Sequence, residues 1–177
     1  MKKFVIGYGI DYVETDNGYY LIAIPTTDSI SAADASLLTA DNNYDLYGWD
    51  RTATNEEWHN YKNDMFFLSN GRGYLYANQG NREMNITATL RRSSLPVTLT
   101  PAFDEQAGGW NLYGNPFPCE AYITTEAEGM TFYRLVDNQL ELIEGAIAPM
   151  EGFFVKATAA NQTFIISREA PAKHVQP

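Results

Sequence analysis

Hydrophobic residues along the chain gather in short runs that are bounded by glycine, proline, asparagine and aspartate. The runs at 19–24 (YYLIAI) and 73–77 (GYLYA) are rich in aromatic and aliphatic residues, and residues 81–92 (NREMNITATLRR) alternate between polar and apolar positions. Such runs are typical of half-buried β-strands. Pro25 and Pro116 end two of the runs, because proline lacks the N–H that a strand needs for its ladder. The pattern therefore predicts an all-β fold.

One segment departs from the strand pattern. Residues 29–41 (SISAADASLLTAD) place Ser31 three residues before Asp34, a spacing that fits a capping box at the start of a helix. Leu37 and Leu38 offer a small apolar patch that can lie on a sheet. We expect one short helix here.

The hydrophobic runs also repeat along the chain. Four pairs of segments match in the same order, with an offset that falls from 91 to 78 residues: 18–25 with 109–116, 46–49 with 132–135, 70–77 with 149–156, and 84–90 with 162–167. A falling offset is expected of two copies of one unit when the second has shorter loops. Chance accounts for any single match in a β-rich sequence, but four matches in one order favour duplication.

These matches predict a single β-sandwich domain over residues 1–177, jelly-roll-like and built of two pseudo-repeated units. The first repeat covers 18–90 and the second 109–167, and a flexible tail follows at 168–177. Each copy is small for a stable domain, so we expect the two to share one core. The residues expected to include core positions are Trp110, Leu112, Phe153 and Val155.

Both repeats carry glycine just before an aromatic run, Gly71 and Gly73 in the first and Gly152 in the second. Glycine at such a place holds a positive φ or lets a neighbouring backbone approach. A tight turn or bulge is favoured over a phosphate-binding loop, because neither copy reads G-x-G-x-x-G followed by a helix.

Composition supports the β prediction and excludes several classes of function. Aromatic residues make up 14% and charged residues 19%, a balance that favours sheets over a helical bundle. The net charge of −10 repels nucleic acid and anionic membrane surfaces. No apolar run approaches the length of a membrane span, so we expect no membrane insertion by this chain.

Few residues suit catalysis. Cys119 is the single cysteine and has no local partner, so it forms no disulfide within the chain and suggests no zinc site. Its pairing with His59 or His174 as nucleophile and base is disfavoured, because nothing in the sequence lowers the pKa of the thiol. Glu56 and Glu57 would serve as a glycosidase pair only across a cleft. We predict no catalytic residues, no cofactor and no enzymatic activity.

The segment DNNYDLYG places Asp41, Asn43 and Asp45 at alternate positions, like the opening of a calcium loop. An EF-hand requires glycine where Leu46 stands and glutamate where Thr52 stands. A solvated turn is the better interpretation, so no metal site is predicted.

Aromatic residues cluster in the first repeat, around TNEEWHNYKND. Trp49, Trp58, Tyr61 and Tyr47 lie near Asn, Asp and His residues, which is the chemistry of a carbohydrate platform. Core packing is the alternative, because Trp58 and the adjacent His59 point to opposite faces of any strand. These four aromatic residues are the candidate ligand-binding site.

Several motifs together carry a resemblance to a known module. They are GWNLYGNPFPCEAYI at 109–123, GAIAPMEGFFVKA at 145–157, GYYLIAIP at 18–25, EEWHNYK at 56–62 and NGRGYLYAN at 70–78. In these motifs the chain resembles a β-sandwich module of large multi-domain surface proteins of Bacteroidetes. The resemblance covers about residues 18–167 and carries no catalytic residue.

The resemblance implies a non-catalytic module, structural or adhesive, of a cell-surface or extracellular protein. Its partners would be the other domains of a larger protein and host or dietary glycans. The export signal would lie outside this sequence, because residues 1–14 lack the long apolar stretch and cleavage site of a signal peptide. A carbohydrate-binding module is the alternative function, and a glycan-active enzyme ranks third.

Overall fold

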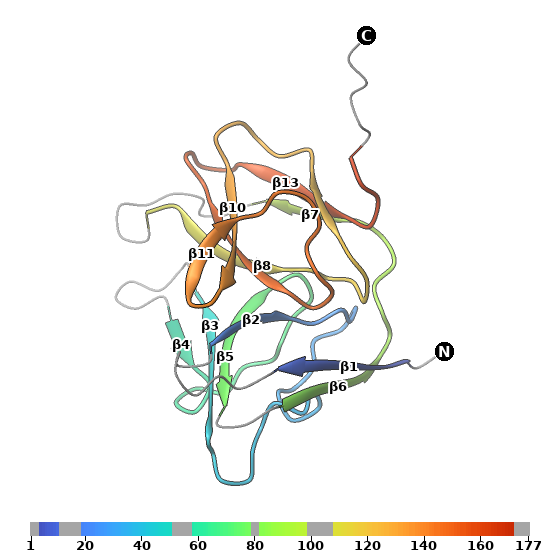
Figure 1. Ribbon diagram of the computed structural model, residues 1–177, viewed down its shortest axis with the longest axis vertical. Coiled ribbons are helices and arrows are strands. Elements are labelled where there is room, and N and C mark those ends of the chain that lie inside the picture. Colours follow the sequence, from blue (N-terminus) through green and yellow to red (C-terminus); the bar gives the residue numbers. More distant parts are fainter. Residues whose placement is uncertain (1–3, 11–18, 51–57, 79–81, 99–107, 172–177) are drawn as a thin grey trace.

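The computed structural model describes residues 4–10, 19–50, 58–78, 82–98 and 108–171 (Figure 1). The described residues form thirteen β-strands and no helix, so the predicted all-β class is confirmed. The strands pair antiparallel in four sheets. None of the described residues belongs to a helix with the length and apolar character that a membrane span requires.

The first unit comprises β1 to β6 and contains two sheets. Its larger sheet has the order β2-β5-β3-β4, with β2 at Tyr20–Ala23, β5 at Gly73–Asn78, β3 at Tyr44–Trp49 and β4 at Trp58–Asn60. Its smaller sheet pairs β1 (Phe4–Ile10) with β6 (Arg82–Ala88). In Figure 1 this unit is coloured from blue to green and lies below the second unit.

The second unit comprises β7 to β13 and repeats this arrangement. Its larger sheet has the order β8-β12-β10-β11, with β8 at Trp110–Gly114, β12 at Gly152–Lys156, β10 at Thr131–Val136 and β11 at Gln139–Leu142. Its smaller sheet has the order β7-β13-β9, with β7 at Leu95–Thr98, β13 at Thr163–Ser167 and β9 at Tyr122–Thr124. The larger sheets of the two units thus have the same order of equivalent strands.

The register of the larger sheets is also the same. In the first unit Leu75 lies between Leu21 on β2 and Tyr47 on β3. In the second unit Phe154 lies between Leu112 on β8 and Tyr133 on β10. These pairs are the ones that the sequence repeat aligns, so a pseudo-two-fold axis relates the two sheets residue by residue.

Backbone contacts join the units across this axis. Ile22 bridges Glu151, and Arg72 bridges Tyr113 in the equivalent place. The Ala23 N–H donates to the carbonyl of Met150 at 2.8 Å, and the equivalent Gly114 N–H donates to the carbonyl of Gly71 at 3.0 Å. Each contact therefore occurs twice, once from each unit.

Glycines make this approach possible. A Cβ on Gly73 would overlap the carbonyl oxygen of Tyr113, and a Cβ on Gly152 would lie 2.9 Å from the carbonyl oxygen of Ile22. Both glycines therefore serve the close approach of the other unit, whereas Gly71, with φ 77°, serves a turn. The preference for a tight turn or bulge was thus wrong for Gly73 and Gly152.

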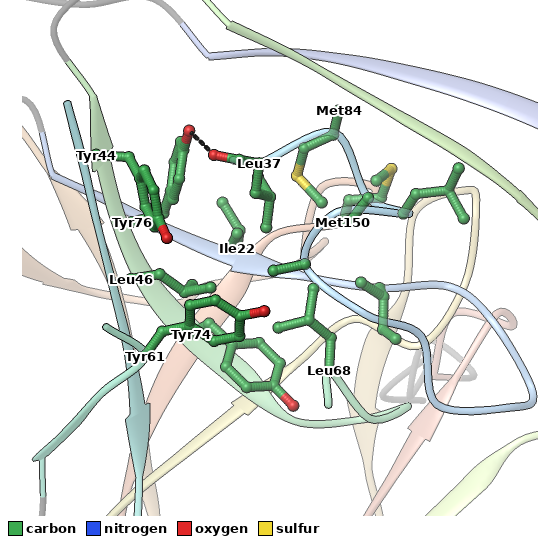
Figure 2. Close-up of a cluster of buried hydrophobic side chains, with 14 residues drawn as sticks. Ile22, Leu37, Tyr44, Leu46, Tyr61, Leu68, Tyr74, Tyr76, Met84 and Met150 are labelled. Carbon is green, nitrogen blue, oxygen red and sulfur yellow. Dashed lines mark hydrogen bonds between the residues drawn. The ribbon is translucent and has the colours of Figure 1, made fainter. Parts of the chain in front are cut away.

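Each unit has its own hydrophobic core. The first core, shown in Figure 2, contains Ile22, Tyr74 and Tyr76, whose hydroxyl donates to the carbonyl of Leu37 at 2.8 Å. The second core contains the buried residues Tyr113, Phe117, Ala121, Met130, Phe132, Ile147, Phe153, Val155, Ala157, Phe164 and Ile166. The expectation of one shared core is wrong, because the buried side chains form two separate clusters. Among the described residues of the second unit, only Met150 is buried in the first core (Figure 2).

The predicted helix at 29–41 is a single turn. The Asp34 N–H donates to Ser31 Oγ at 3.1 Å, as expected of a cap, and the Leu37 N–H donates to the carbonyl of Ala32 at 3.0 Å. Ser36 then adopts a φ of 59°, which ends the turn. The helix prediction is wrong, although Leu37 is buried as its apolar role requires. Of the predicted tail at 168–177, residues from 172 on lie outside the described residues.

Candidate functional site

Strands β3 and β4 bring three of the four predicted site residues together. Trp49 pairs with Trp58, and Tyr47 lies two residues from Trp49, so the three side chains share one face of the sheet. The rings of Trp49 and Trp58 are 4.8 Å apart and those of Tyr47 and Trp58 are 6.3 Å apart. All three side chains are half-buried.

Tyr61 lies elsewhere. It follows β4 on the opposite face, where it is 7% exposed and belongs to the first core. Its ring packs edge-on against Phe66 at 5.3 Å. Tyr61 therefore contributes no surface beside Trp49 and Trp58.

The second unit extends the aromatic cluster. Phe154 of β12 lies 6.4 Å from Trp49 and 6.2 Å from Trp58, and Trp110 of β8 lies 5.9 Å from Phe154. Tyr133 of β10 lies 5.3 Å from Trp110. We call this set the aromatic strip: Tyr47, Trp49, Trp58, Phe154, Trp110 and Tyr133.

Sequence reasoning missed half of this strip. Leu112, Phe153 and Val155 are buried as predicted, but Trp110 is half-buried and faces the strip. The signal was present in GFFVK, because Phe154 stands between two buried residues of one strand and so must point to the other face. What it contacts there depends on the docking of the units, which local sequence does not encode.

An open pocket of about 250 Å³ lies at the end of β3, on the face of the sheet opposite the strip, and includes Trp49 in its lining. Its lining consists of Gly48, Trp49, Asp50, His59, Phe66, Ser69, Arg72, Gly73 and Tyr74. The rings of Phe66 and Tyr74 stack at 5.8 Å, and a Cβ on Gly48 would lie 3.4 Å from Phe66 Cζ. Gly48 therefore adds no side chain to the space that these rings line, and the Phe66 ring lies at van der Waals distance from its Cβ position.

Polar groups from three segments surround this space. His59 Nε2 lies 3.7 Å from Asp50 Oδ2. The two are close because β4 pairs His59 with Gly48, and Asp50 follows two residues after Gly48. Arg72 is exposed, and its guanidinium lies 5.4 Å from the centre of the Tyr113 ring. No carboxylate of the described residues forms an ion pair with Arg72.

Tyr74 forms a neutral wall of the pocket. The Ser69 N–H donates to its hydroxyl oxygen at 2.7 Å. Burial raises the pKa of Tyr74 above its ordinary value, although the hydrogen bonds of Ser69 and the charge of Arg72 act in the opposite direction. The side chain is therefore an uncharged phenol at neutral pH.

The other candidate groups are not assembled in the described residues. Cys119 is exposed in the second unit, and Asp45 of the suggested calcium loop lies 3.4 Å from Lys62 Nζ. No three His, Cys, Asp or Glu side chains gather as metal ligands within the described ranges. Glu56, Glu57 and His174 lie outside those ranges. The candidate functional site therefore consists of the aromatic strip and the pocket.

The chain matches no protein-family model, no curated protein and no solved structure. Its function must therefore be inferred from its own residues.

Proposed function

We propose that the chain is a non-catalytic adhesive module of a cell-surface or secreted bacterial protein, and that it adheres by binding carbohydrate. The observation that carries the proposal is the pair of half-buried rings of Trp49 and Trp58 together with the polar pocket of Asp50, His59 and Arg72, whose lining includes Trp49. The other domains of a larger protein would position the module toward host or dietary glycans.

The two kinds of side chain suit the two kinds of surface on a sugar. The C–H faces of a pyranose ring pack against aromatic rings, while its hydroxyl groups require hydrogen-bond partners. The Asp50 carboxylate accepts from hydroxyl groups, and the Arg72 guanidinium donates to hydroxyl oxygens. The pocket, in which the Phe66 ring lies beside these polar groups, therefore favours carbohydrate over a purely apolar ligand.

Such a site binds weakly on its own. One aromatic contact contributes about 0.5–1.5 kcal/mol beyond its burial, so a single pocket gives modest affinity. A surface that displays many copies of the module gains avidity by raising the effective concentration of neighbouring sites. Weak single sites are therefore compatible with adhesion.

A structural spacer is the competing function, because the rings of the strip also contact one another across the two units. Binding distinguishes the two functions. We expect the purified chain to bind at least one glycan on a glycan array, and titration calorimetry to give its affinity.

The matched variants are Trp58→Ala and Phe67→Ala. Trp58 belongs to the strip, whereas Phe67 is a 67% exposed aromatic residue outside the pocket lining. We expect Trp58→Ala to weaken binding by about two- to tenfold and Phe67→Ala to leave it unchanged. Melting curves of both variants report whether the fold persists. An array without bound glycan, or equal affinity of the folded Trp58→Ala variant and wild type, would support the spacer.

A non-catalytic module leaves its ligand unchanged. We expect the bound oligosaccharide to be recovered intact after prolonged incubation, as measured by chromatography. Cleavage of the oligosaccharide by an activity that stays with the protein through purification would instead favour the glycan-active enzyme.

A further inference from the structure

The second unit contains the structural counterpart of the pocket, and it is filled. Gly48 follows Tyr47 on β3, and Arg134 follows the equivalent Tyr133 on β10. Gly48 pairs with His59 on the neighbouring strand, just as Arg134 pairs with Glu141. The register therefore places the arginine side chain where the first unit has none.

Arg134 is fixed in that place by several contacts. Its Nε lies 3.2 Å from Glu151 Oε1, and its Nη2 donates to the carbonyl of Ala146 at 2.6 Å. Glu151 Oε2 in turn accepts from the Ala148 N–H at 2.7 Å. The second unit thus contains its own guanidinium and its own carboxylate at this position.

The pseudo-two-fold axis relates Glu151 to Arg72, since Glu151 bridges Ile22 and Arg72 bridges the equivalent Tyr113. The first unit therefore has a cation where the second has a carboxylate. It also has an open space where the second has the side chain that neutralises that carboxylate.

Gly48 is needed for the space and not for the backbone. It lies within β3, and its φ is outside the positive range of Gly71, Gly108, Gly109, Gly129 and Gly145. A larger residue would be compatible with the strand conformation. The effect of glycine here is that no side chain enters the pocket from this position, where the Phe66 ring lies at van der Waals distance.

Two charged groups face this space. His59 Nε2 lies 3.7 Å from Asp50 Oδ2, and no carboxylate forms an ion pair with Arg72 in the part of the chain that the structure describes. An anionic group of a ligand would compensate the charge of Arg72, just as Arg134 compensates the charge of the equivalent Glu151 in the second unit.

We propose that the pocket at Gly48 receives the carboxylate-bearing terminal residue of an acidic glycan, with Arg72 as its counter-charge and the ring of Phe66 against the sugar. This assignment rests on the proposed carbohydrate binding and adds the ligand class. It also makes Gly48 a specificity-determining residue. The second unit contributes no equivalent site, because Arg134 occupies it.

The test uses a matched pair of ligands, an oligosaccharide that ends in glucuronic acid and its carboxyl-reduced counterpart, which ends in glucose. Hydrogen bonds to charged groups are stronger than neutral ones, so we expect the wild-type chain to bind the acid at least about tenfold more tightly. Acetate, a carboxylate without a sugar ring, is expected not to compete at equal concentration.

Two variants that remove one positive charge complete the design. Arg72→Gln is expected to lower the affinity for the acid to that for the reduced sugar, and Arg92→Gln, at an exposed position outside the pocket lining, is expected to leave it unchanged. The double variant Gly48→Arg, Arg72→Glu recreates the filled second-unit arrangement and is expected to bind neither sugar. Melting curves establish folding, and Arg72→Gln alone decides the question if the double variant does not fold.

Equal binding of the acid and its reduced counterpart, with both weakened by Trp58→Ala, would overturn the acidic-glycan assignment while leaving carbohydrate binding in place. Loss of acid binding in Arg92→Gln as large as in Arg72→Gln, or displacement by acetate, would overturn it as well. Failure to bind either sugar or any glycan on the array would overturn the proposed function itself.

Discussion

At the scale of single residues, the pseudo-two-fold axis passes between Ala23 and Gly114. These residues are equivalent in the two units, and a Cβ on Gly114 would overlap the Ala23 methyl group. It would also lie 3.1 Å from the carbonyl oxygen of Arg72. The axis therefore accommodates one methyl group and not two.

Gly114→Ala is expected to destabilise the fold by about 1–3 kcal/mol, because backbone on both sides prevents relaxation. Urea denaturation measures the change. In the double variant Ala23→Gly, Gly114→Ala the methyl group moves to the other side of the axis, and most of the loss should be recovered. A double variant that is less stable than Gly114→Ala would contradict this account.

Phe153 on β12 and Trp110 on β8 should differ in how much their replacement by alanine destabilises the fold. Phe153 is fully buried, so Phe153→Ala should lower the free energy of unfolding by about 3–5 kcal/mol. Trp110 is half-buried with Lys156 Nζ 5.1 Å from its ring centre, so Trp110→Ala should cost less. Denaturation of the two variants under the same conditions tests the order, and an equal or larger loss for Trp110→Ala would show that its strip contacts are as important as the core.

At the scale of elements, β10 and β11 form a hairpin around Asp137 and Asn138. Both residues have positive φ, 47° and 59°, which is the requirement of a type I′ turn. Glycine meets this requirement at the second position without a Cβ penalty. Asn138→Gly should therefore stabilise the protein by about 0.5 kcal/mol, and Asn138→Ala should destabilise it by a similar amount. Thermal melts that rank the variants in the opposite order would exclude this turn type.

Sequence patterns predicted which segments form strands better than they predicted where an element ends. The ordered matches between 18–25 and 109–116 fall on strands that the structure places in equivalent sheets, because local alternation determines which runs become strands. The cap at Ser31 was also identified, but one residue of positive φ at Ser36 stopped the helix after a turn. A single backbone angle of this kind leaves no periodic signal.

The candidate site was predicted in part for the same reason. Trp49 and Trp58 were grouped because they lie close in sequence, and their strands do pair. Proximity also suggested Tyr61, which the alternation of side chains turns into the core. Phe154 on β12 and Arg72, which precedes β5, reach the site from distant segments, so their participation depends on long-range pairing and on the docking of the units.

At the scale of the whole molecule, the junction between the units contains a partly buried carboxyl group, that of Glu151. Burial raises the pKa of Glu151, and the Ala148 hydrogen bond and the charge of Arg134 oppose this effect only in part. Above the ordinary value of 4.5, and up to the higher value in the folded state, the folded chain therefore binds more protons than the unfolded chain. Over that window the contribution of Glu151 to stability falls as pH rises.

Glu151→Gln removes this titration. The free energy of unfolding of the wild type, minus that of Glu151→Gln, should decrease as pH increases from 4.5. Denaturation at a series of pH values gives the difference, with Glu141→Gln as a control at an exposed position of β11. A difference that is constant or increases with pH would mean that the ion pair with Arg134 outweighs burial.

The contact of Ala23 with Gly114 also bears on how such a molecule can evolve. In a homodimer of one unit, symmetry obliges both subunits to carry the same residue on the axis, so every mutation there acts twice. Joining the duplicated units in one polypeptide removes this constraint. Alanine can then face glycine, and Gly48 and Arg134 can differ at equivalent positions. Because the two units belong to one polypeptide, the two residues at each pair of equivalent positions can mutate independently.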